Sequence, residues 1–301
     1  MSTVWANLGV VYVVWGSTYA AIALVVESMP PLMSAGLRFL TAGLLLASFL
    51  LFRKTSLAIT RQQFLSTSLI AILLLAIGNG AVMYGEQTIS SGVASLLICG
   101  TPLWMAVFRT ITGDHLGKIS LVGIAVGFIG MMVLVLPGSE AIEGADPAAV
   151  TAATIIVLIG SFTWSIGSFV SKKLTLPSNP FVYTTWQMLI GGVVLLVGGA
   201  ALGEKIDFAN IELHSWLGWF YLVTVGSLIA YSSYVWLLGN APISLVATYA
   251  YVNPVVAVVL GVLFLRETFT SNMLIGGIIV VLGVVLTISG ERPPSTTPSE
   301  G

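Results

Sequence analysis

The 301-residue chain is poor in charged residues. Only 8% of its residues are Asp, Glu, Lys or Arg, and 57% are hydrophobic. An ordinary soluble domain is roughly 25% charged. So few charged side chains cannot cover the surface of a soluble protein of this length. The composition therefore excludes a soluble enzyme and predicts an integral membrane protein.

Cysteine, histidine and net charge are also scarce, and each scarcity excludes a class of site. Cys99 is the only cysteine, so no intrachain disulfide is possible. The two histidines, His115 and His214, fall in predicted loops, away from any metal-binding spacing. The formal net charge of −1 leaves no basic surface for nucleic acid. Neither a metal ion, a cofactor nor a nucleic-acid partner is expected.

Long apolar runs are what the sequence has in abundance. A helix needs about 20 apolar residues to cross the ~30 Å hydrocarbon layer of a bilayer. The runs are continuous, which predicts helices, whereas β-barrel strands alternate apolar and polar residues. Ten spans are expected, at residues 5–26, 32–52, 64–85, 92–110, 119–137, 151–171, 181–202, 216–238, 244–264 and 272–289. The first lacks the basic flank of a signal peptide and is expected to be retained. The polar tail 290–301 is expected to be disordered and cytoplasmic.

The distribution of basic residues predicts the orientation of the chain. With ten spans, both termini lie on the same side of the membrane. Eight of the eleven basic residues fall in loops on that side, namely Arg53, Lys54, Arg61, Arg109, Lys118, Lys172, Lys173 and Arg292. Lys205 and Arg266 lie on the other side, and Arg38 lies within the second span. Because cytoplasmic loops are rich in Lys and Arg, both termini are predicted to be cytoplasmic, in the inner (plasma) membrane.

The two halves of the sequence resemble each other at a spacing of 149 to 153 residues. The matched positions include Trp15 and Trp164, Pro31 and Pro180, Arg38 and Gln187, and Thr101-Pro102 and Asn253-Pro254. Residues 5–137 and 151–289 are therefore expected to form two five-helix repeats. Because five is odd, the second repeat is inverted in the membrane, and the two halves are expected to enclose a central cavity. Inverted repeats are typical of secondary transporters.

Several stretches in both halves carry a family resemblance. They are residues 14–19 (Val-Trp-Gly-Ser-Thr-Tyr), 30–31 (Pro-Pro), 36–39 (Gly-Leu-Arg-Phe), 249–257 and 266–267. Together they resemble EamA-type members of the drug/metabolite transporter superfamily, over about residues 5–289. The resemblance implies ten helices around a central cavity, alternating access, and export of small metabolites or amphipathic compounds. One departure is that Asp114-His115 stands where the second repeat has Arg266-Glu267.

Arg38 is the clearest candidate for a binding residue. Placing an ionisable group at the centre of a membrane helix costs at least ~2.5–3.5 kcal/mol, so such groups usually face the protein interior. Arg38 lies six residues, or about 9 Å, into the second predicted span. It is interpreted as a contact for an anion or a carboxylate. Extension to the outer headgroups, or an ion pair that fixes helix packing, is the alternative. Gln187 supplies a neutral amide at the matching position.

Asn79 and Glu86 lie two helical turns apart on one face of the third predicted span. Both are candidates for lining the cavity. Glu86 is expected to pair with Arg38 or, if buried, to bind a coupling proton. The alternative is a carboxylate at headgroup level that caps the following loop.

Aromatic residues near the middle of the spans form a further group of candidates. Interfacial belts account for most aromatic residues in membrane proteins, but a belt explains mid-span residues poorly. Flat, partly apolar ligands suit such rings. Packing between helices is the alternative for each. The candidate substrate contacts are Trp15, Tyr19, Trp104, Trp164, Tyr234 and Tyr251, with the amide of Asn253.

Pro102 and Pro254 occupy matching mid-span positions. A proline removes one backbone donor and clashes with the carbonyl four residues earlier, here that of Ile98 or Ala250. Neighbouring Thr101 and Asn253 can satisfy the freed carbonyls. The paired placement predicts hinges of the kind that transporters use, with a harmless kink as the alternative.

These observations predict a secondary active or facilitative transporter. It would export small organic metabolites, amino acids among them, or amphipathic drugs, by alternating access. No ATP-binding loop is present, so gradients of substrate or of ions, with protons as a candidate, would drive transport. An intramembrane enzyme and a channel are the alternatives, but neither paired catalytic groups at membrane depth nor a ring of charged or carbonyl groups is evident. The expected partners are the lipid bilayer and a small-molecule substrate, with the protein a monomer or weak homodimer.

Overall fold

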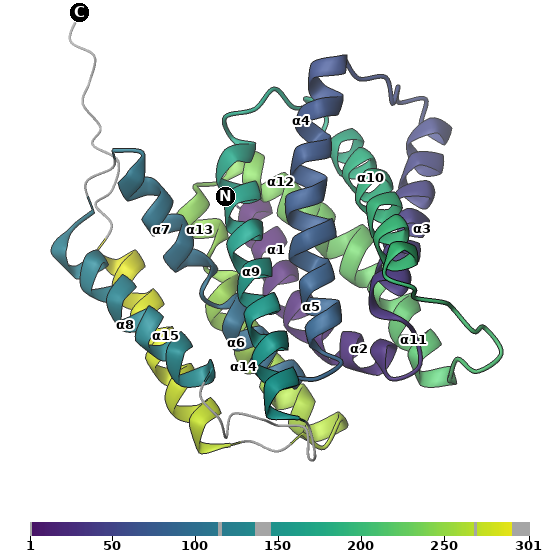
Figure 1. Ribbon diagram of the computed structural model, residues 1–301. Coiled ribbons are helices and arrows are strands. Elements are labelled where there is room, and N and C mark those ends of the chain that lie inside the picture. Colours follow the sequence, from purple (N-terminus) through teal and green to yellow (C-terminus); the bar gives the residue numbers. More distant parts are fainter. Residues whose placement is uncertain (1, 114–115, 136–145, 268–269, 291–301) are drawn as a thin grey trace, which may run out of the picture.

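The computed structural model describes residues 2–113, 116–135, 146–267 and 270–290, with all their side chains except those of Val135, Ser244 and Tyr251. These residues form helices joined by short connections, and no strand occurs among them (Figure 1). The predicted cytoplasmic tail, apart from Gly290, lies outside the described residues.

The first half of the chain contains helices α1 to α8. They are α1 (Ser2–Val10), η1 (Val11–Trp15), α2 (Gly16–Val26), α3 (Pro31–Phe52), α4 (Arg61–Ala71), η2 (Ile72–Asn79), α5 (Gly80–Gly85), α6 (Ser91–Ile98), α7 (Thr101–Ile111) and α8 (Lys118–Val135). The segments η1 and η2 are π-helical: each hydrogen bond spans five residues, and the helix is locally widened. Such segments often occur at functional sites.

The second half contains helices α9 to α15. They are α9 (Pro147–Ser171), α10 (Pro180–Ala201), α11 (Leu213–Tyr221), η3 (Leu222–Tyr231), α12 (Ser232–Asn240), α13 (Ile243–Val246), α14 (Tyr249–Phe264) and α15 (Ser271–Ser289). The π-helical segment η3 begins 150 residues after η2 begins. The two halves therefore share this unusual feature at the spacing of the sequence repeat.

Eight of the described helical runs are long and apolar enough to cross a membrane. They are 2–26, 31–52, 61–85, 91–111, 147–171, 180–201, 213–240 and 271–289. Two further apolar helices, Lys118–Leu134 and Val252–Phe264, are shorter. Lys118–Leu134 begins one residue before the predicted span 119–137, and Val252–Phe264 falls within the predicted span 244–264. Residues 136–137 lie outside the described residues. The prediction of an all-α membrane protein that crosses the bilayer several times is confirmed.

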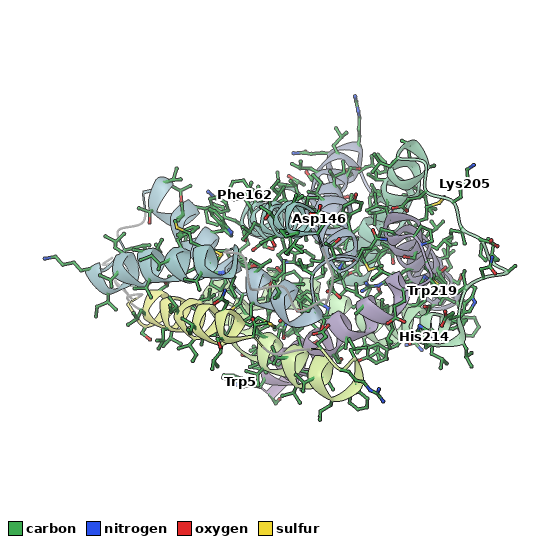
Figure 2. All side chains as sticks on the ribbon, turned by 60° about the horizontal axis from the view of Figure 1, so that its bottom comes forward. Trp5, Asp146, Phe162, Lys205, His214 and Trp219 are labelled. Carbon is green, nitrogen blue, oxygen red and sulfur yellow. The ribbon has the colours of Figure 1, made fainter. Side chains whose placement is uncertain are left out.

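Large apolar side chains cover the outside of the helices. Phe52 is 85% exposed and Phe264 is 74% exposed. Trp5 and Phe162 also lie on the outer surface (Figure 2). Apolar patches of this extent are rare on soluble monomers. In a bilayer they contact lipid tails.

Two close helix pairs flank the molecule. α3 packs along α10, and α8 packs along α15 at the opposite edge (Figure 1). Glycine makes both approaches possible, because the backbones almost touch. A Cβ atom added at Gly283 would lie 2.3 Å from the backbone nitrogen of Gly127, and one at Gly192 would lie 2.7 Å from that of Leu40. Between the pairs lie the helices that surround the site described below.

Prolines and glutamates fix where several helices begin. Pro31, Pro147 and Pro180 open α3, α9 and α10, at positions where the missing N–H removes no helical hydrogen bond. Glu204 accepts hydrogen bonds from the backbone nitrogens of Leu32 (3.2 Å) and Met33 (2.8 Å) at the start of α3. Residues from the second half of the chain thus cap helices of the first half.

Candidate functional site

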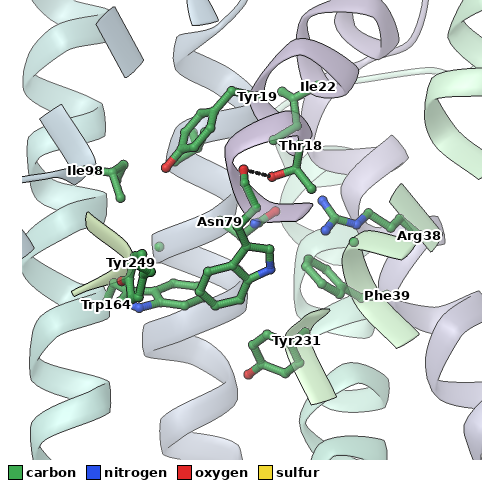
Figure 3. Close-up of a pocket in the computed structure, with 14 residues that line it drawn as sticks. Thr18, Tyr19, Ile22, Arg38, Phe39, Asn79, Ile98, Trp164, Tyr231 and Tyr249 are labelled. Atoms are coloured by element: carbon green, nitrogen blue, oxygen red, sulfur yellow. Dashed lines mark hydrogen bonds between the residues drawn. The ribbon is translucent and has the colours of Figure 1, made fainter. Parts of the chain in front are cut away.

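A cavity of about 60 Å³ lies among η1, α2, α3, η2, α5, α6, α9, η3 and α14. We call it the central cavity. Six aromatic residues contribute to its wall: Trp15, Tyr19, Phe39, Trp164, Tyr231 and Tyr249. Its polar wall comes from Thr18, Arg38 and Asn79 (Figure 3). A mostly apolar lining with a few convergent polar groups is typical of a small-molecule site.

Arg38 brings a positive charge to the central cavity without a fixed negative partner. Its side chain is 3% exposed, and its Nε donates to Ser227 Oγ at 2.8 Å. Its Nη1 is buried and has no hydrogen-bond partner. The guanidinium also lies 4.7 Å from the centre of the Phe39 ring. Among the described residues no ion pair to Arg38 is found, so neither the predicted pairing with Glu86 nor extension to the headgroups is seen.

Gly226 leaves the space that the guanidinium occupies. A Cβ atom at this position would lie 3.3 Å from Arg38 Nη2 and 3.1 Å from Thr18 Cγ2. Gly226 belongs to η3, and Ser227 on the same segment holds the Arg38 Nε. The π-helical segment therefore both accommodates and orients the cation.

Asn79 supplies an acceptor on the same cavity. It is the last residue of η2, and its Oδ1 is buried without a hydrogen-bond partner. Unsatisfied buried polar atoms are rare in native proteins, and a bound ligand is one way to satisfy them. The central cavity thus offers a free cationic donor from α3 and a free amide acceptor from η2.

Aromatic rings pack closely along one side of the cavity. The Trp15 ring centroid lies 5.4 Å from that of Trp164, 4.7 Å from that of Tyr234 and 5.3 Å from that of Tyr249. Trp164 Nε1 donates to the Tyr234 hydroxyl at 3.1 Å, and the Ser168 hydroxyl lies 2.6 Å from the same oxygen. These contacts join residues of the first half to residues of the second.

Several predicted site residues lie behind the cavity wall. Tyr234 is fully buried beneath Trp15 and Trp164. Gln187 is also fully buried, and its Oε1 accepts from the Tyr231 hydroxyl at 3.0 Å, while its Nε2 has no partner. Both can support cavity residues without lining the cavity themselves.

Trp104 and Asn253 are not placed at the cavity. Trp104 packs edge-on against Phe128 and Phe162, with centroid distances of 4.7 and 5.1 Å. With its amide turned to satisfy its hydrogen bonds, Asn253 donates to the carbonyls of Tyr12 (2.9 Å) and Tyr249 (3.2 Å). The side chain of Tyr251 lies outside the described residues.

Thr18, Phe39, Tyr231 and Tyr249 line the cavity although they were not predicted as site residues. One signal was available for α2. Trp15, Thr18, Tyr19 and Ile22 follow the spacing i, i+3, i+4, i+7 and therefore share one helix face.

Glu86 follows α5, in the connection between two spans, and is 4% exposed. Neither of its carboxyl oxygens has a hydrogen-bond partner. Burial, and secondarily the nearby carboxyl of Glu267, raise the pKa of Glu86 well above its usual value. Glu86 does not line the central cavity, but it lies on the same helical face as Asn79 and Val82, which do.

The connection after α9 holds Lys172, a second residue whose pKa differs from its usual value. Partial burial lowers the pKa of Lys172, and its Nζ donates to the carbonyl oxygen of Ala241 at 3.0 Å.

Pro102 lies next to a break between two helices, whereas Pro254 lies inside a continuous helix. α6 ends at Ile98 and α7 begins at Thr101, next to Pro102, and Thr101 Oγ1 donates to the Ile98 carbonyl at 2.7 Å. Thr101 thus satisfies the carbonyl that proline frees. Pro254 lies inside α14, and the nearby Asn253 amide donates to the carbonyl of Tyr249 instead of that of Ala250.

No group of three or more His, Cys, Asp or Glu side chains is arranged to hold a metal ion in the part of the chain that the structure describes. The described cavity chemistry is that of reversible binding: one cation, one amide acceptor and a wall of rings.

These features define a helical membrane protein with a small-molecule cavity among its spans. The profile of the EamA-like transporter family matches residues 4–136 and 151–289. The chain therefore belongs to the EamA-like transporter family, as the sequence resemblance predicted.

Relatives extend along almost the whole chain. An uncharacterized inner membrane transporter, YedA, from Escherichia coli K12 is 40% identical over 281 residues, which are 93% of this chain and 89% of that protein. A probable amino-acid metabolite efflux pump from the same strain is 27% identical, over 94% of this chain and 93% of that one. A solved crystal structure with 17% identity and a TM-score of 0.68 covers 95% of this chain and 96% of its own, and shares the fold.

Proposed function

We propose that this transporter exports amino acids and related small organic acids by alternating access through the central cavity. The observation that carries the proposal is the buried Arg38 guanidinium, whose Nη1 has no partner. A substrate carboxylate would supply both the missing negative charge and strong, charge-assisted hydrogen bonds.

The rest of the cavity complements an amino acid. Asn79 Oδ1 is free to accept a hydrogen bond from a substrate ammonium group. The Trp15, Tyr19 and Trp164 rings offer apolar surface to the side chain. Amino acids with apolar or aromatic side chains fit this arrangement best. The similarity to a probable amino-acid metabolite efflux pump supports the same substrate class.

The architecture that we infer is ten crossings in two inverted five-helix repeats, residues 5–137 and 151–289. Three observations support it. The family profile matches the chain twice, η2 and η3 recur at a spacing of 150 residues, and equivalent helices pair with each other as α3 with α10 and α8 with α15. Here α8 crosses as the fifth helix, and α13 with α14 forms the ninth.

In this arrangement both termini are cytoplasmic, because the loops on that side carry most of the Lys and Arg residues. We place the protein in the inner membrane, as the name of its relative YedA states for that protein. One chain supplies all the walls of the central cavity, so a monomer is sufficient for transport.

Alternating access requires that contacts on the two sides of the cavity break in turn. On the inferred cytoplasmic side, Trp15 contacts Trp164, and the Tyr12 hydroxyl is hydrogen-bonded to Thr248 Oγ1. On the other side, Glu204 and Glu267 of the second half cap α3 and α6 of the first. The helix break beside Pro102 and the proline inside α14, Pro254, are the points at which we expect the chain to bend between the two states.

Counterflow in proteoliposomes tests the proposal. Vesicles loaded with an unlabelled amino acid are diluted into buffer that contains the same amino acid in labelled form, for a panel that includes phenylalanine, tryptophan, threonine and glutamate. We expect transient accumulation of label with apolar or aromatic amino acids, and little with Arg38→Gln protein. Absence of counterflow with every amino acid of the panel would overturn the proposal.

A further inference from the structure

Glu86 differs in burial and in hydrogen bonding from four other glutamates on its side of the molecule. Glu204 is bound by the α3 backbone, and Glu267 accepts hydrogen bonds from the Ser91 nitrogen (2.8 Å) and hydroxyl (3.0 Å) at the start of α6. Glu27 and Glu212 are exposed and lie next to His214. Glu86 alone among these five is buried with both oxygens unpartnered.

Among the described residues, no side chain forms an ion pair or a hydrogen bond with the Glu86 carboxyl group. The helical segments packed against α5 are η2, α2, α3 and α9. Neither η2 nor α9 contains a titratable residue; α2 contributes only Tyr19, and α3 only Arg38, which is bound to Ser227 on η3. The groups within electrostatic range of Glu86 are Tyr19 and the carboxyl of Glu267, with the buried Cys99 thiol beyond Tyr19.

A carboxyl group in such a place is stable only in its neutral form. Its ionised form would lose hydration without gaining a donor or a cation. The conformation seen here therefore selects a protonated Glu86. A conformation that admits water to this position would let the proton leave. The two conformations would then bind different numbers of protons, which is the thermodynamic requirement for coupling.

Tyr19 links this position to the central cavity. Its side chain lines the cavity, and its hydroxyl lies within electrostatic range of the Glu86 carboxyl. Val82 and Asn79, one and two turns before Glu86 on the same helical face, line the cavity as well. Any movement of α5 that reshapes the cavity also changes the surroundings of Glu86.

We propose that Glu86 is the proton-binding residue through which an inward proton gradient drives export. The proposal rests on the transport function proposed above. Protonation of Glu86 favours the conformation described here, and release of the proton accompanies the change to the opposite state. The chemistry is the reversible transfer of one proton between water and a carboxylate oxygen.

Transport of labelled phenylalanine in proteoliposomes tests the coupling. Wild type, Glu86→Gln and Glu212→Gln are compared in counterflow at equal pH and in accumulation driven by a pH gradient. Glu212 is a matched control because its carboxylate is exposed on the same side of the molecule. We expect Glu86→Gln, a fixed mimic of the protonated residue, to lose accumulation driven by the pH gradient. Its counterflow should stay measurable, and Glu212→Gln should behave as wild type.

The outcomes separate the two proposals. Absence of phenylalanine counterflow in wild type contradicts transport of this amino acid. The protonation of Glu86 is then tested by the infrared measurement described next. Full accumulation driven by the pH gradient in Glu86→Gln overturns the role of Glu86 whatever the substrate.

Infrared spectroscopy provides a readout that needs no substrate. A protonated carboxyl band at neutral pH should be present in wild type, shifted in Glu86→Asp and absent in Glu86→Gln. If the three spectra agree in this region, the proposal is wrong. The Glu86→Asp variant keeps the test valid if the glutamine variant fails to fold.

Discussion

Trp15 and Trp164 meet edge to face, with ring centroids 5.4 Å apart and ring planes at 80°. They are 149 residues apart in the sequence and occupy equivalent positions in its two similar halves. Each half of the chain thus contributes the same residue to one contact at the central cavity. In a transporter that alternates between two states, such a contact is well placed to close one side.

The contact predicts unequal effects for two substitutions of Trp164. Trp164→Ala removes ring contacts with Trp15 and Tyr234 and the hydrogen bond to the Tyr234 hydroxyl. Trp164 also lines the cavity, and the apolar contact that its ring offers to the substrate contributes about 1.5–3 kcal/mol, so we expect the KM for phenylalanine counterflow to rise about tenfold or more. Trp164→Phe keeps a ring and loses only the hydrogen bond, so its KM should rise less.

Trp5→Ala is the control for these two variants, because Trp5 is 58% exposed on the outer surface. It should leave the KM unchanged. Equal KM values for Trp164→Ala and wild type would show that the ring cluster does not shape the substrate site.

If Arg38 binds the substrate carboxylate, substitution of Arg38 should weaken the binding only of substrates that have a carboxylate. Arg38→Gln should weaken phenylalanine binding about tenfold or more, because a hydrogen bond to a charged group contributes about 1.5–3 kcal/mol. In Arg38 the planar guanidinium can bond Ser227 through Nε and keep Nη1 free for the substrate. Arg38→Lys keeps the charge but loses this planar group, so phenylalanine binding should be weaker than in wild type and stronger than in Arg38→Gln. Competition assays with phenethylamine, which has no carboxylate, measure whether the effect belongs to that group.

One outcome of the competition assay would contradict carboxylate binding by Arg38. If Arg38→Gln weakens phenethylamine and phenylalanine equally, Arg38 supports the fold and does not bind the carboxylate. Arg61→Gln, an exposed residue at the start of α4, should change neither.

The helices were predictable because bilayer-spanning apolar runs are long and continuous. The π-helical segments η2 and η3 were not predicted, because widening a helix by one residue barely alters its apolar pattern. Yet η2 places Asn79 at the cavity, and η3 carries Gly226 and Ser227 beside Arg38. Asn79 was predicted at the cavity, but the space that Gly226 leaves for Arg38 and the hydroxyl of Ser227 that binds it were not, because both depend on the local geometry of η3.

Side-chain environments were harder to predict than helices. Trp104 resembles Trp15 in depth and chemistry, but Phe128 and Phe162 surround it, and their arrangement depends on how α7, α8 and α9 pack. Glu86 and Glu267 are both carboxylates at predicted span ends. Only the fold decides that the α6 backbone bonds Glu267 and leaves Glu86 without a donor.

Glycines in the α8 and α15 pair predict a difference in stability between two similar substitutions. In Gly283→Ala the new Cβ would lie 2.3 Å from the Gly127 backbone nitrogen, so the helices must separate. In Gly127→Ala the nearest atom is the end of the Leu103 side chain, which can rotate. We expect Gly283→Ala to lower the free energy of unfolding by about 1–3 kcal/mol and Gly127→Ala to lower it less.

Thermal unfolding in detergent measures this difference. Gly198→Ala serves as a control, because no atom lies within 4 Å of its added Cβ. A Gly283→Ala protein as stable as Gly198→Ala would mean that α8 and α15 are not in backbone contact.

Glu86 makes the stability of the fold depend on pH in a direction opposite to that of most carboxylates. Its pKa in the folded protein lies well above the usual value of 4.5, mainly because of burial and also because of Glu267. Between these two pKa values the folded state holds one more proton than the unfolded state. Stability due to this group is therefore fully present below pH 4.5 and is lost as pH rises towards the folded pKa.

The pH dependence of thermal unfolding in detergent tests this sign. Wild type should lose up to about 1.4 kcal/mol per pH unit relative to Glu86→Gln over that interval, because the glutamine cannot release a proton. The two unfolding curves should therefore lie closest at acidic pH and separate as pH rises, with the variant the more stable. Glu212→Gln, which alters an exposed carboxylate, should follow wild type throughout. A constant difference between wild type and Glu86→Gln at all pH values would show that the pKa of Glu86 is the same in the folded and the unfolded protein, and would contradict the prediction.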